Sequence, residues 1–308
     1  GSAFSIPCLE NKNKVTITEP YSKVFIKNLS SKDKFHSALK MKLPKKMNFS
    51  KYSKDLLKEK FDLIVIALSL SGIDFIGKEL KNLKIQTPIL VLTKGLKYEK
   101  KKRKILTISE KLNKGFKIKD ISILKGPCLA KELAKKNQTS VIIANKNVNK
   151  AKKLGNMIST KYYLIEYSKD TVGVEISSAI KNIYAMIIGA GQSLNAASNL
   201  FQKSIVEMKY LIKFFKGDVE TILGLAGIGD LYVSAAGGRN SKMGSYLGKG
   251  FKFEIAKKRF MAKDTVEGEQ LVQEIAPFVL KKIDKKKIPL MINLIKTIKD
   301  NKKLNIKV

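Results

Sequence analysis

The first half of the chain alternates short apolar runs with longer, lysine-rich segments. Several of the runs are apolar on both faces, which is typical of strands buried between two layers of helices. The expected strands cover residues 14–18, 62–68, 88–93, 121–124, 140–144 and 162–166. The expected helices between them cover residues 53–60, 73–83, 97–112, 129–137 and 149–159. This alternation predicts a doubly wound α/β domain.

The strand pattern stops near Lys169, and from Gly173 onward helical periodicity is broken only by glycine-rich loops. We therefore predict a Rossmann-type dinucleotide-binding domain over residues 1–170 and an all-α domain over residues 171–308. In the first domain the initial strand is expected to be missing, because no hydrophobic run precedes Gly1. This order of domains is typical of dehydrogenases that bind a nicotinamide cofactor at the carboxyl ends of the strands.

The helix expected over Gly173–Gly191 is apolar nearly all round, yet Lys181 and Asn182 lie in its middle. A helix of this kind is normally buried, and a buried ammonium is costly unless an anionic or strongly polar group meets it. Burial also lowers the pKa of a lysine, which suits a proton donor that works near neutral pH. A lysine that extends its ammonium to water along its own stem would fit the same pattern.

A partner for this lysine is available in the glycine-rich stretch Gly224–Asn240. Asp230 is a lone carboxylate among apolar residues there. Arg239 follows, and it is one of three arginines in a chain where lysine is the usual basic residue. An arginine in this setting suggests a site that needs the planar guanidinium fork, such as a phosphate. An ordinary glycine-rich loop remains the alternative.

Loops that follow the expected strands carry the other candidates. Lys94 follows the run at 88–93 and therefore lies at the carboxyl edge of the sheet. Gly126 opens a tight strand-to-helix turn whose free amides favour an anion. The fingerprint for a dinucleotide is poor, because Gly1 is the only glycine of its turn. Glu19, just past a strand, is a candidate for the adenosine ribose hydroxyls, although a surface glutamate fits equally well.

Composition narrows the function further. The net charge of +35 would suggest a polyanion partner, but 58 of the 61 basic residues are lysines spread along the whole chain. We therefore expect solvated lysine-rich faces and no specific nucleic-acid site. With Cys8, Cys128 and His36 as the only cysteines and histidine, a zinc site and a Ser-His-Asp triad are excluded. No metal site, signal peptide or transmembrane segment is expected, and the cysteine use fits the cytoplasm.

Six motifs occur in an order and spacing that resemble the bacterial-type NAD(P)-dependent glycerol-3-phosphate dehydrogenases. These motifs are TKG, GPCLAKE, VGVEISSAIKN, GLAGIGDLYVS, GRN and TVEGE. The resemblance covers residues 3 to about 270. It implies an oxidoreductase that interconverts dihydroxyacetone phosphate and sn-glycerol 3-phosphate with NAD or NADP, feeding glycerophospholipid synthesis. It also implies a homodimer, which the residues themselves do not indicate.

The resemblance also implies roles for individual residues. Lys181 matches the catalytic lysine. Matches to substrate-binding positions are Lys94, Gly126, Cys128, Asn182, Asp230, Ser234, Gly238, Arg239 and Asn240. Matches to cofactor-binding positions are Ala3, Phe4, Lys94, Ala130, Arg239, Thr265 and Glu267, to which Glu19 is added from its place after a strand.

The chain departs from the family pattern in several places. Cys128 stands where Ser or Thr is usual, Ser234 replaces Thr, Gly238 replaces Ser, and two glycines of the first loop are replaced. Two alternatives therefore stay open beside an active glycerol-3-phosphate dehydrogenase. One is a related two-domain dehydrogenase that acts on another hydroxy acid. The other is a relative with impaired cofactor binding and no activity, such as a lysine-rich polyanion-binding protein.

Overall fold

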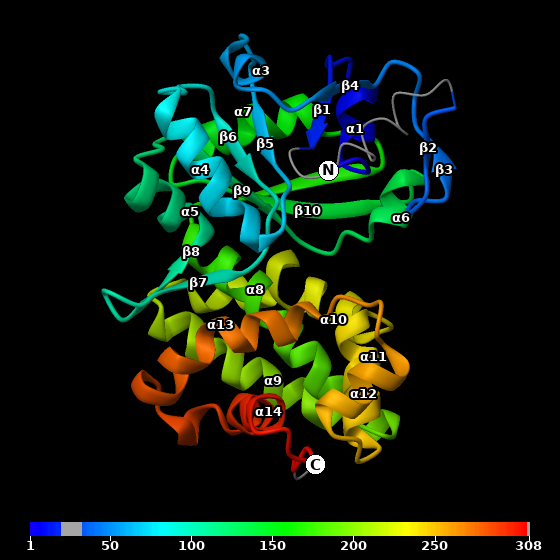
Figure 1. The fold of residues 1–308 in the computed structure, drawn as a ribbon, viewed down its shortest axis with the longest axis vertical. Coiled ribbons are helices and arrows are strands. Elements are labelled where there is room, and N and C mark those ends of the chain that lie inside the picture. Colours follow the sequence, from blue (N-terminus) through cyan, green and yellow to red (C-terminus); the bar gives the residue numbers. More distant parts are fainter. Residues whose placement is uncertain (20–32, 307–308) are drawn as a thin grey trace. The chain divides into compact units, whose positions relative to one another are not determined.

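The computed structural model describes residues 1–19 and 33–306, which belong to two compact units (Figure 1). The first unit takes Gly1–Thr93, Leu112–Leu124 and Cys128–Lys169, and the second takes Lys94–Lys111, Lys125–Pro127 and Asp170–Val308. The second unit thus includes two segments from the half of the chain that the sequence assigned entirely to the first domain. Both segments carry residues of the candidate site.

A five-stranded sheet forms the centre of the first unit. Its strands, in the order β11-β10-β9-β6-β5, are Tyr163–Ser168, Thr139–Ala144, Ile121–Lys125, Ile89–Val91 and Ile64–Ile66. The pairs β5–β6, β6–β9 and β10–β11 are parallel. These strands coincide with five of the six predicted apolar runs. Thr93 Oγ1 donates a hydrogen bond of 2.8 Å to the Leu68 carbonyl and so joins the loops that follow β5 and β6.

Shorter strands form two further sheets. The sixth predicted run gives β1 (Thr16–Glu19), which pairs in parallel with β4 (Asn48–Lys51). Strands β2 (Phe35–His36) and β3 (Met41–Lys42) form an antiparallel pair. The sequence predicted none of β2, β3 and β4, because each is only two to four residues long and polar or half-exposed.

Short helices connect the strands of this unit. They are α1 (Ser5–Glu10), α3 (Lys54–Lys58), η1 (Leu70–Gly72), α4 (Ile73–Asn82), η2 (Lys111–Gly115), α6 (Ala130–Ala134) and α7 (Val148–Ile158). One apolar cluster, which includes Phe4, Leu90, Val141, Leu154 and Tyr163, joins α1, α7 and the sheet. Helix α1, six residues long, fits into the short stretch before β1.

The prediction of a helix over residues 97–112 is wrong. An antiparallel hairpin forms there instead, with β7 (Leu96–Glu99) and β8 (Lys104–Thr107), followed by the short helix α5 (Ile108–Glu110). The lysine-rich stretch suits a helix by propensity, but Arg103 adopts a φ of 47° and closes a turn. Leu96 and Ile105 are then buried in the core of the second unit. Tertiary packing overrides helix propensity here.

From Asp170 on, the described residues of the second unit form helices and the loops between them. Its α-helices are α8 (Thr171–Gly189), α9 (Leu194–Phe214), α10 (Asp230–Ala235), α11 (Arg239–Gly248), α12 (Phe253–Phe260), α13 (Glu267–Lys282) and α14 (Pro289–Lys299). Shorter helical turns are η3 (Val219–Leu223), η4 (Leu225–Gly229) and η5 (Lys285–Lys287). Helix α8 is the core element, and every residue from Gly173 to Ile188 is buried.

Helix α8 starts at a well-defined cap. The Asp170 carboxylate accepts a hydrogen bond from the Gly173 amide at 2.8 Å, and its other oxygen accepts one from Thr221 Oγ1 at 2.6 Å. Among the described residues α8 is also the one helix long and apolar enough to cross a membrane by length and composition. Because 89% of that stretch is buried inside the protein, its apolar character is explained by its place in the core.

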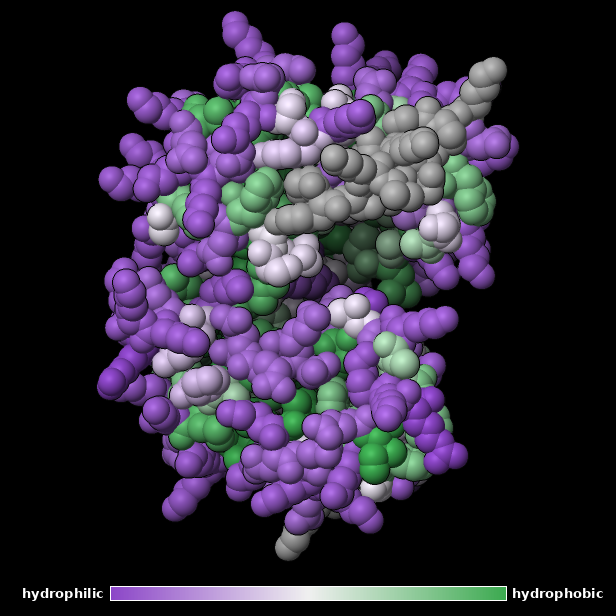
Figure 2. Space-filling model, viewed as in Figure 1, coloured by the Kyte–Doolittle hydropathy of each residue, from purple (hydrophilic) through white to green (hydrophobic). Residues whose placement is uncertain are grey.

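Close packing between α8 and α11 brings residues of the candidate site together. A Cβ atom at Gly244 would lie 1.9 Å from the Met186 carbonyl oxygen, so only glycine lets the two helix backbones approach this closely. The start of α11 is thereby held beside the middle of α8. Hydrophilic side chains cover most of the visible surface (Figure 2), in line with the expectation that the lysine excess lies on solvated faces.

Candidate active site

Lys181 lies in the middle of α8 and is 6% exposed. Its ammonium donates a hydrogen bond of 2.6 Å to Asp230 Oδ1 and another to Ser234 Oγ. Both partners are on α10, 49 and 53 residues along the chain. The expected pairing of Lys181 with Asp230 is therefore present, and the ammonium does not extend to water.

Asp230 holds two lysines, one on each carboxylate oxygen. While Lys181 uses Oδ1, the ammonium of Lys94 lies 2.5 Å from Oδ2. The Asp230 side chain is only 3% exposed, whereas that of Lys94 is 29% exposed. A buried carboxylate between two ammonium groups leaves an excess positive charge at this point. Such a cluster favours an additional anionic or electron-rich ligand.

The surroundings lower the pKa of Lys181 to about 8. Burial is the main cause, the positive charge of Lys94 acts in the same direction, and Asp230 opposes both. An ammonium with a pKa near the ambient pH gives up its proton readily and can take it back. Lys181 therefore has the protonation behaviour of a general acid–base group.

A second network of polar side chains surrounds Asn182. Its amide nitrogen donates to Glu267 Oε2 at 3.1 Å, and its Oδ1 accepts from Asn240 Nδ2 at 3.2 Å. Asn240 Oδ1 in turn accepts from the Gly268 amide at 2.8 Å. These bonds tie α8 to the starts of α11 and α13.

Arg239 joins this network from its outer side. It is the first residue of α11, after Gly238 as N-cap, and its Nη2 lies 3.2 Å from Glu267 Oε1. Both side chains are about half exposed, so the guanidinium can exchange this carboxylate for another anion at little cost. Thr265, two residues before Glu267, is exposed.

Gly126 belongs to the second unit together with these residues. Its φ of 130° is a conformation that L side chains rarely adopt, so the turn after β9 requires glycine. Two charged residues near it escaped the sequence analysis, namely Lys125 and Glu175, each 2% exposed. The sequence does contain a signal for Lys125, because this lysine is the last residue of the apolar strand ISILK. Glu175 lies on the same apolar helix as Lys181.

The remaining candidates lie in the first unit. Ala3 and Phe4 are buried, and the Phe4 ring meets Tyr163 edge to face with 6.2 Å between the ring centroids. Cys128 packs at the margin of the same core, and Ala130 is the exposed first residue of α6. Glu19 ends β1. Ala3, Phe4 and Cys128 therefore share one apolar cluster, of which Ala130 and Glu19 are not part.

The order of helices and strands in the first unit suits the binding of a nicotinamide cofactor. The segment 1–4 leads into α1, β1 follows, and Glu19 stands at the carboxyl end of β1, where a carboxylate can bind ribose hydroxyls. Because the Ala3 and Phe4 side chains are buried in the core, these two residues offer mainly their backbone to a ligand. We name Glu19 and the backbone of this turn as the groups that would hold the adenosine half.

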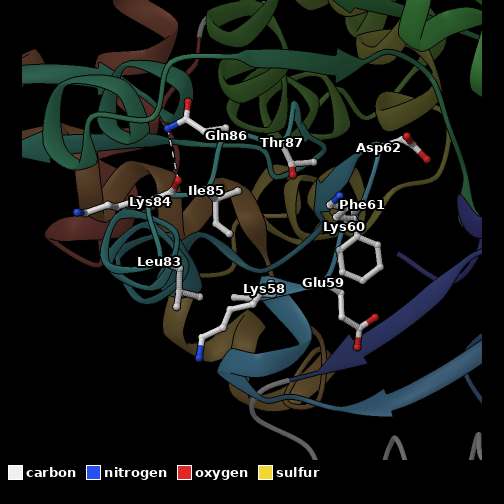
Figure 3. A pocket seen from close by; sticks show the side chains of 11 residues that line it. Lys58, Glu59, Lys60, Phe61, Asp62, Leu83, Lys84, Ile85, Gln86 and Thr87 are labelled. Atoms are coloured by element: carbon white, nitrogen blue, oxygen red, sulfur yellow. Dashed lines mark hydrogen bonds between the residues drawn. The ribbon is translucent and has the colours of Figure 1, made fainter.

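One hollow of about 480 Å³ occurs elsewhere in the first unit, between residues 57–62 and 83–87 (Figure 3). It lies before the starts of β5 and β6, at the edge of the sheet opposite to that of the strand ends. The charged ends of Lys58, Glu59, Asp62 and Lys84 point in different directions there. Without converging polar groups, this hollow is no candidate site.

A Rossmann-type unit followed by a helical unit with a buried, carboxylate-bound lysine defines the class of two-domain nicotinamide-dependent dehydrogenases. Sequence profiles described as the N-terminus and the C-terminus of NAD-dependent glycerol-3-phosphate dehydrogenase match residues 1–151 and 170–307. The chain therefore belongs to the NAD-dependent glycerol-3-phosphate dehydrogenase family.

Individual relatives agree with this assignment. An NADP(+)-dependent glycerol-3-phosphate dehydrogenase of Archaeoglobus fulgidus is 31% identical over 272 residues, covering 83% of this chain and 79% of the relative. A glycerol-3-phosphate dehydrogenase [NAD(P)+] of Clostridium botulinum is 33% identical over 62% of this chain, which spans 59% of that relative. The crystal structure of glycerol-3-phosphate dehydrogenase from Coxiella burnetii matches with a TM-score of 0.85 at 22% identity, covering 98% of this chain and 92% of the other.

These findings confirm the predicted family and the predicted fold class of a Rossmann-type sheet followed by a helical domain. They do not test the roles of single residues, which stay predictions. The geometry does show which candidates lie together in the second unit. They are Lys94, Lys181, Asp230 and Ser234 in one cluster, and Asn182, Arg239, Asn240 and Glu267 in the other.

Proposed function

We propose that this protein interconverts dihydroxyacetone phosphate and sn-glycerol 3-phosphate with NAD or NADP. The observation that carries the proposal is the buried Lys181 ammonium bound to Asp230 in a chain of this family. The substrate class of the family agrees with the excess positive charge around Asp230. Supply of glycerol 3-phosphate for glycerophospholipids is the corresponding role.

The described side chains carry out the proton transfer of the reaction. The cofactor, when bound, supplies or accepts the hydride at the substrate carbonyl carbon. During reduction negative charge grows on the carbonyl oxygen, and the Lys181 ammonium stabilises this charge and donates its proton there. Asp230 and Ser234 orient the ammonium before and after the transfer. Lys94, on the other oxygen of Asp230, keeps that carboxylate from taking the proton itself.

The substrate phosphate is assigned to Arg239 and to the backbone at Gly126 and Asn240. Arg239 presents a planar fork with several donors, which matches two phosphate oxygens at once. Its present carboxylate partner, Glu267, is half exposed, so the exchange costs little. Asn240 is fixed by its bonds to Asn182 and Gly268, which places the start of α11 relative to Lys181.

A direct assay tests this function. Purified protein is mixed with NADH or NADPH and a panel of carbonyl substrates, namely dihydroxyacetone phosphate, unphosphorylated dihydroxyacetone, pyruvate and a 2-ketopantoate-like keto acid. Among these substrates, only dihydroxyacetone phosphate should give fast oxidation of the cofactor. Turnover with a keto acid, and none with the phosphorylated ketone, would reassign the protein to another two-domain hydroxy-acid dehydrogenase.

Three further expectations stay predictions. The family resemblance implies a homodimer, which sedimentation of the purified protein would test. Cysteine use favours the cytoplasm, and neither Cys8 nor Cys128 forms a disulfide in the described part of the chain. The lysine excess implies no specific nucleic-acid site, so any affinity for DNA should fall steeply with salt.

A further inference from the structure

Lys125 and Lys181 are the two lysines that are buried among the described residues. The remaining lysines of residues 1–19 and 33–306 are exposed or partly exposed, so the lysine-rich composition does not explain these two positions. Lys125 ends β9, directly before the Gly126–Pro127 turn, and belongs to the second unit. Burying an ammonium there requires a compensating charge.

Glu175 supplies this charge. It lies on the second turn of α8 and is 2% exposed, and each of the two residues is the strongest charged neighbour of the other. The carboxylate also accepts hydrogen bonds from the Ser109 amide at 3.0 Å and from Ser109 Oγ. Glu175 is thus fixed by the cap that follows β8, and it fixes Lys125 in turn.

The same ammonium acts on the centre of the candidate site. Besides Glu175, the charges that Lys125 experiences are those of Lys94 and Asp230. The charges that Lys181 experiences are those of Lys94, Asp230 and Glu267. The two buried lysines therefore share Asp230 and Lys94 as neighbours.

Ser178 adds a buried polar group to α8 between Glu175 and Lys181. Ser178 lies three residues after Glu175 and three before Lys181, so it stands between them on the helix surface. Its buried hydroxyl has no hydrogen-bond partner among the described residues.

Resting on the proposed function, we propose that Lys125 is a positioning residue for the reduction of dihydroxyacetone phosphate. Its ammonium, held by Glu175, fixes the turn at Gly126 to the helix that carries Lys181, and its charge interacts with that of Asp230. The distance between the substrate and the proton donor, Lys181, then stays constant. Loss of this charge should lower kcat and leave KM nearly unchanged, because Arg239 still holds the phosphate.

The protonation of Lys125 gives the idea a distinctive signature. Burial lowers the pKa of Lys125 to about 7, with Glu175 opposing the shift. At pH 6 the group is an ammonium, and at pH 8 it is mostly the neutral amine. The charge should therefore support turnover at pH 6 and fade as the pH rises through 7.

The test compares K125M, E175Q and the double variant with the wild type, with steady-state kinetics from pH 6 to 8 and thermal melting. K119M is the matched control, because Lys119 is an exposed lysine just before the other end of β9. At pH 6, K125M should lose about 10- to 100-fold in kcat with KM within about threefold, and the gap should narrow toward pH 8. The double variant should melt nearer the wild-type temperature than K125M does, yet keep its low kcat.

Two results would overturn the proposal while the wild type stays active. One is a kcat of K125M at pH 6 equal to that of the wild type or of K119M. The other is recovery of both melting temperature and kcat in the double variant, because Lys125 would then only neutralise Glu175. An inactive wild type would instead remove the proposed function, and this inference with it.

Discussion

The cluster around Lys181 and the amino-terminal turn of the first unit are built in opposite ways. Around Lys181, buried side chains of opposite charge meet at short distances, and Asp230 serves two lysines with its two oxygens. In the turn at residues 1–4, the Ala3 and Phe4 side chains belong to the apolar core and leave only backbone for a ligand. We therefore expect the first region to recognise its ligand mainly by charge, and the turn to bind mainly through its backbone.

This difference sets the size of the effects that single substitutions should have. A buried charge cluster depends on each member, because removal of one leaves another charge without its partner. A backbone-built turn changes little when one side chain nearby is altered. Substitutions around Lys181 should therefore act mainly on turnover, and those near the first turn on the choice of coenzyme.

The largest effect is expected from K181A. Without the ammonium, the charge that grows on the substrate oxygen is neither stabilised nor protonated. We expect kcat for dihydroxyacetone phosphate to fall by about 10²- to 10⁴-fold, while binding of NADH, followed by its fluorescence, persists. Near-normal turnover in K181A would remove the distinction between the two regions.

Above pH 8, the pH dependence of the wild type should follow Lys181. Its pKa is lowered to about 8, so the ammonium form, which reduction needs, is lost as the pH rises above that value. Reduction should then slow by about tenfold per pH unit above about pH 8, whereas oxidation of glycerol 3-phosphate, which needs the neutral amine, should speed up as the pH rises toward 8 and level off above it. Steady-state rates in both directions measure this, and parallel profiles for the two directions would contradict it.

A smaller effect is expected from R239K. The substitution keeps the positive charge and loses the planar fork, so the phosphate is held by fewer bonds. We expect KM for dihydroxyacetone phosphate to rise by about tenfold or more with a smaller change in kcat. As a control, R259K alters an arginine on α12 outside the site and should leave KM unchanged. An unchanged KM in R239K would place the phosphate elsewhere.

The smallest effect is expected at Glu19, which ends β1 in the first unit. A carboxylate at the end of β1 repels the 2′-phosphate of NADP, so the wild type should prefer NAD. E19Q should shift the ratio of kcat/KM for NADPH over NADH upward by about threefold to tenfold. No shift would show that Glu19 lies outside the cofactor site.

Local sequence patterns determined the elements of the fold that depend on nearby residues. The apolar runs fixed the positions of β1, β5, β6, β9, β10 and β11 to within a few residues. The apolar surface of α8 predicted its burial, and Asp230 was identified as a partner for Lys181 because it is the only carboxylate in its apolar stretch. Periodicity and isolated charges are local properties, and a single sequence displays them.

Only the tertiary structure decided which distant residues pair with the same charged side chain. That Lys94 takes the second oxygen of Asp230 depends on a contact between residues 136 positions apart. The hairpin at 96–107 forms because its apolar side chains are buried in the core of the second unit, and this burial outweighs the helical propensity of the segment. Whether Lys125 faces water or Glu175 is likewise settled by packing. Charge pairing acts through space, and the spacing of residues along the chain does not encode it.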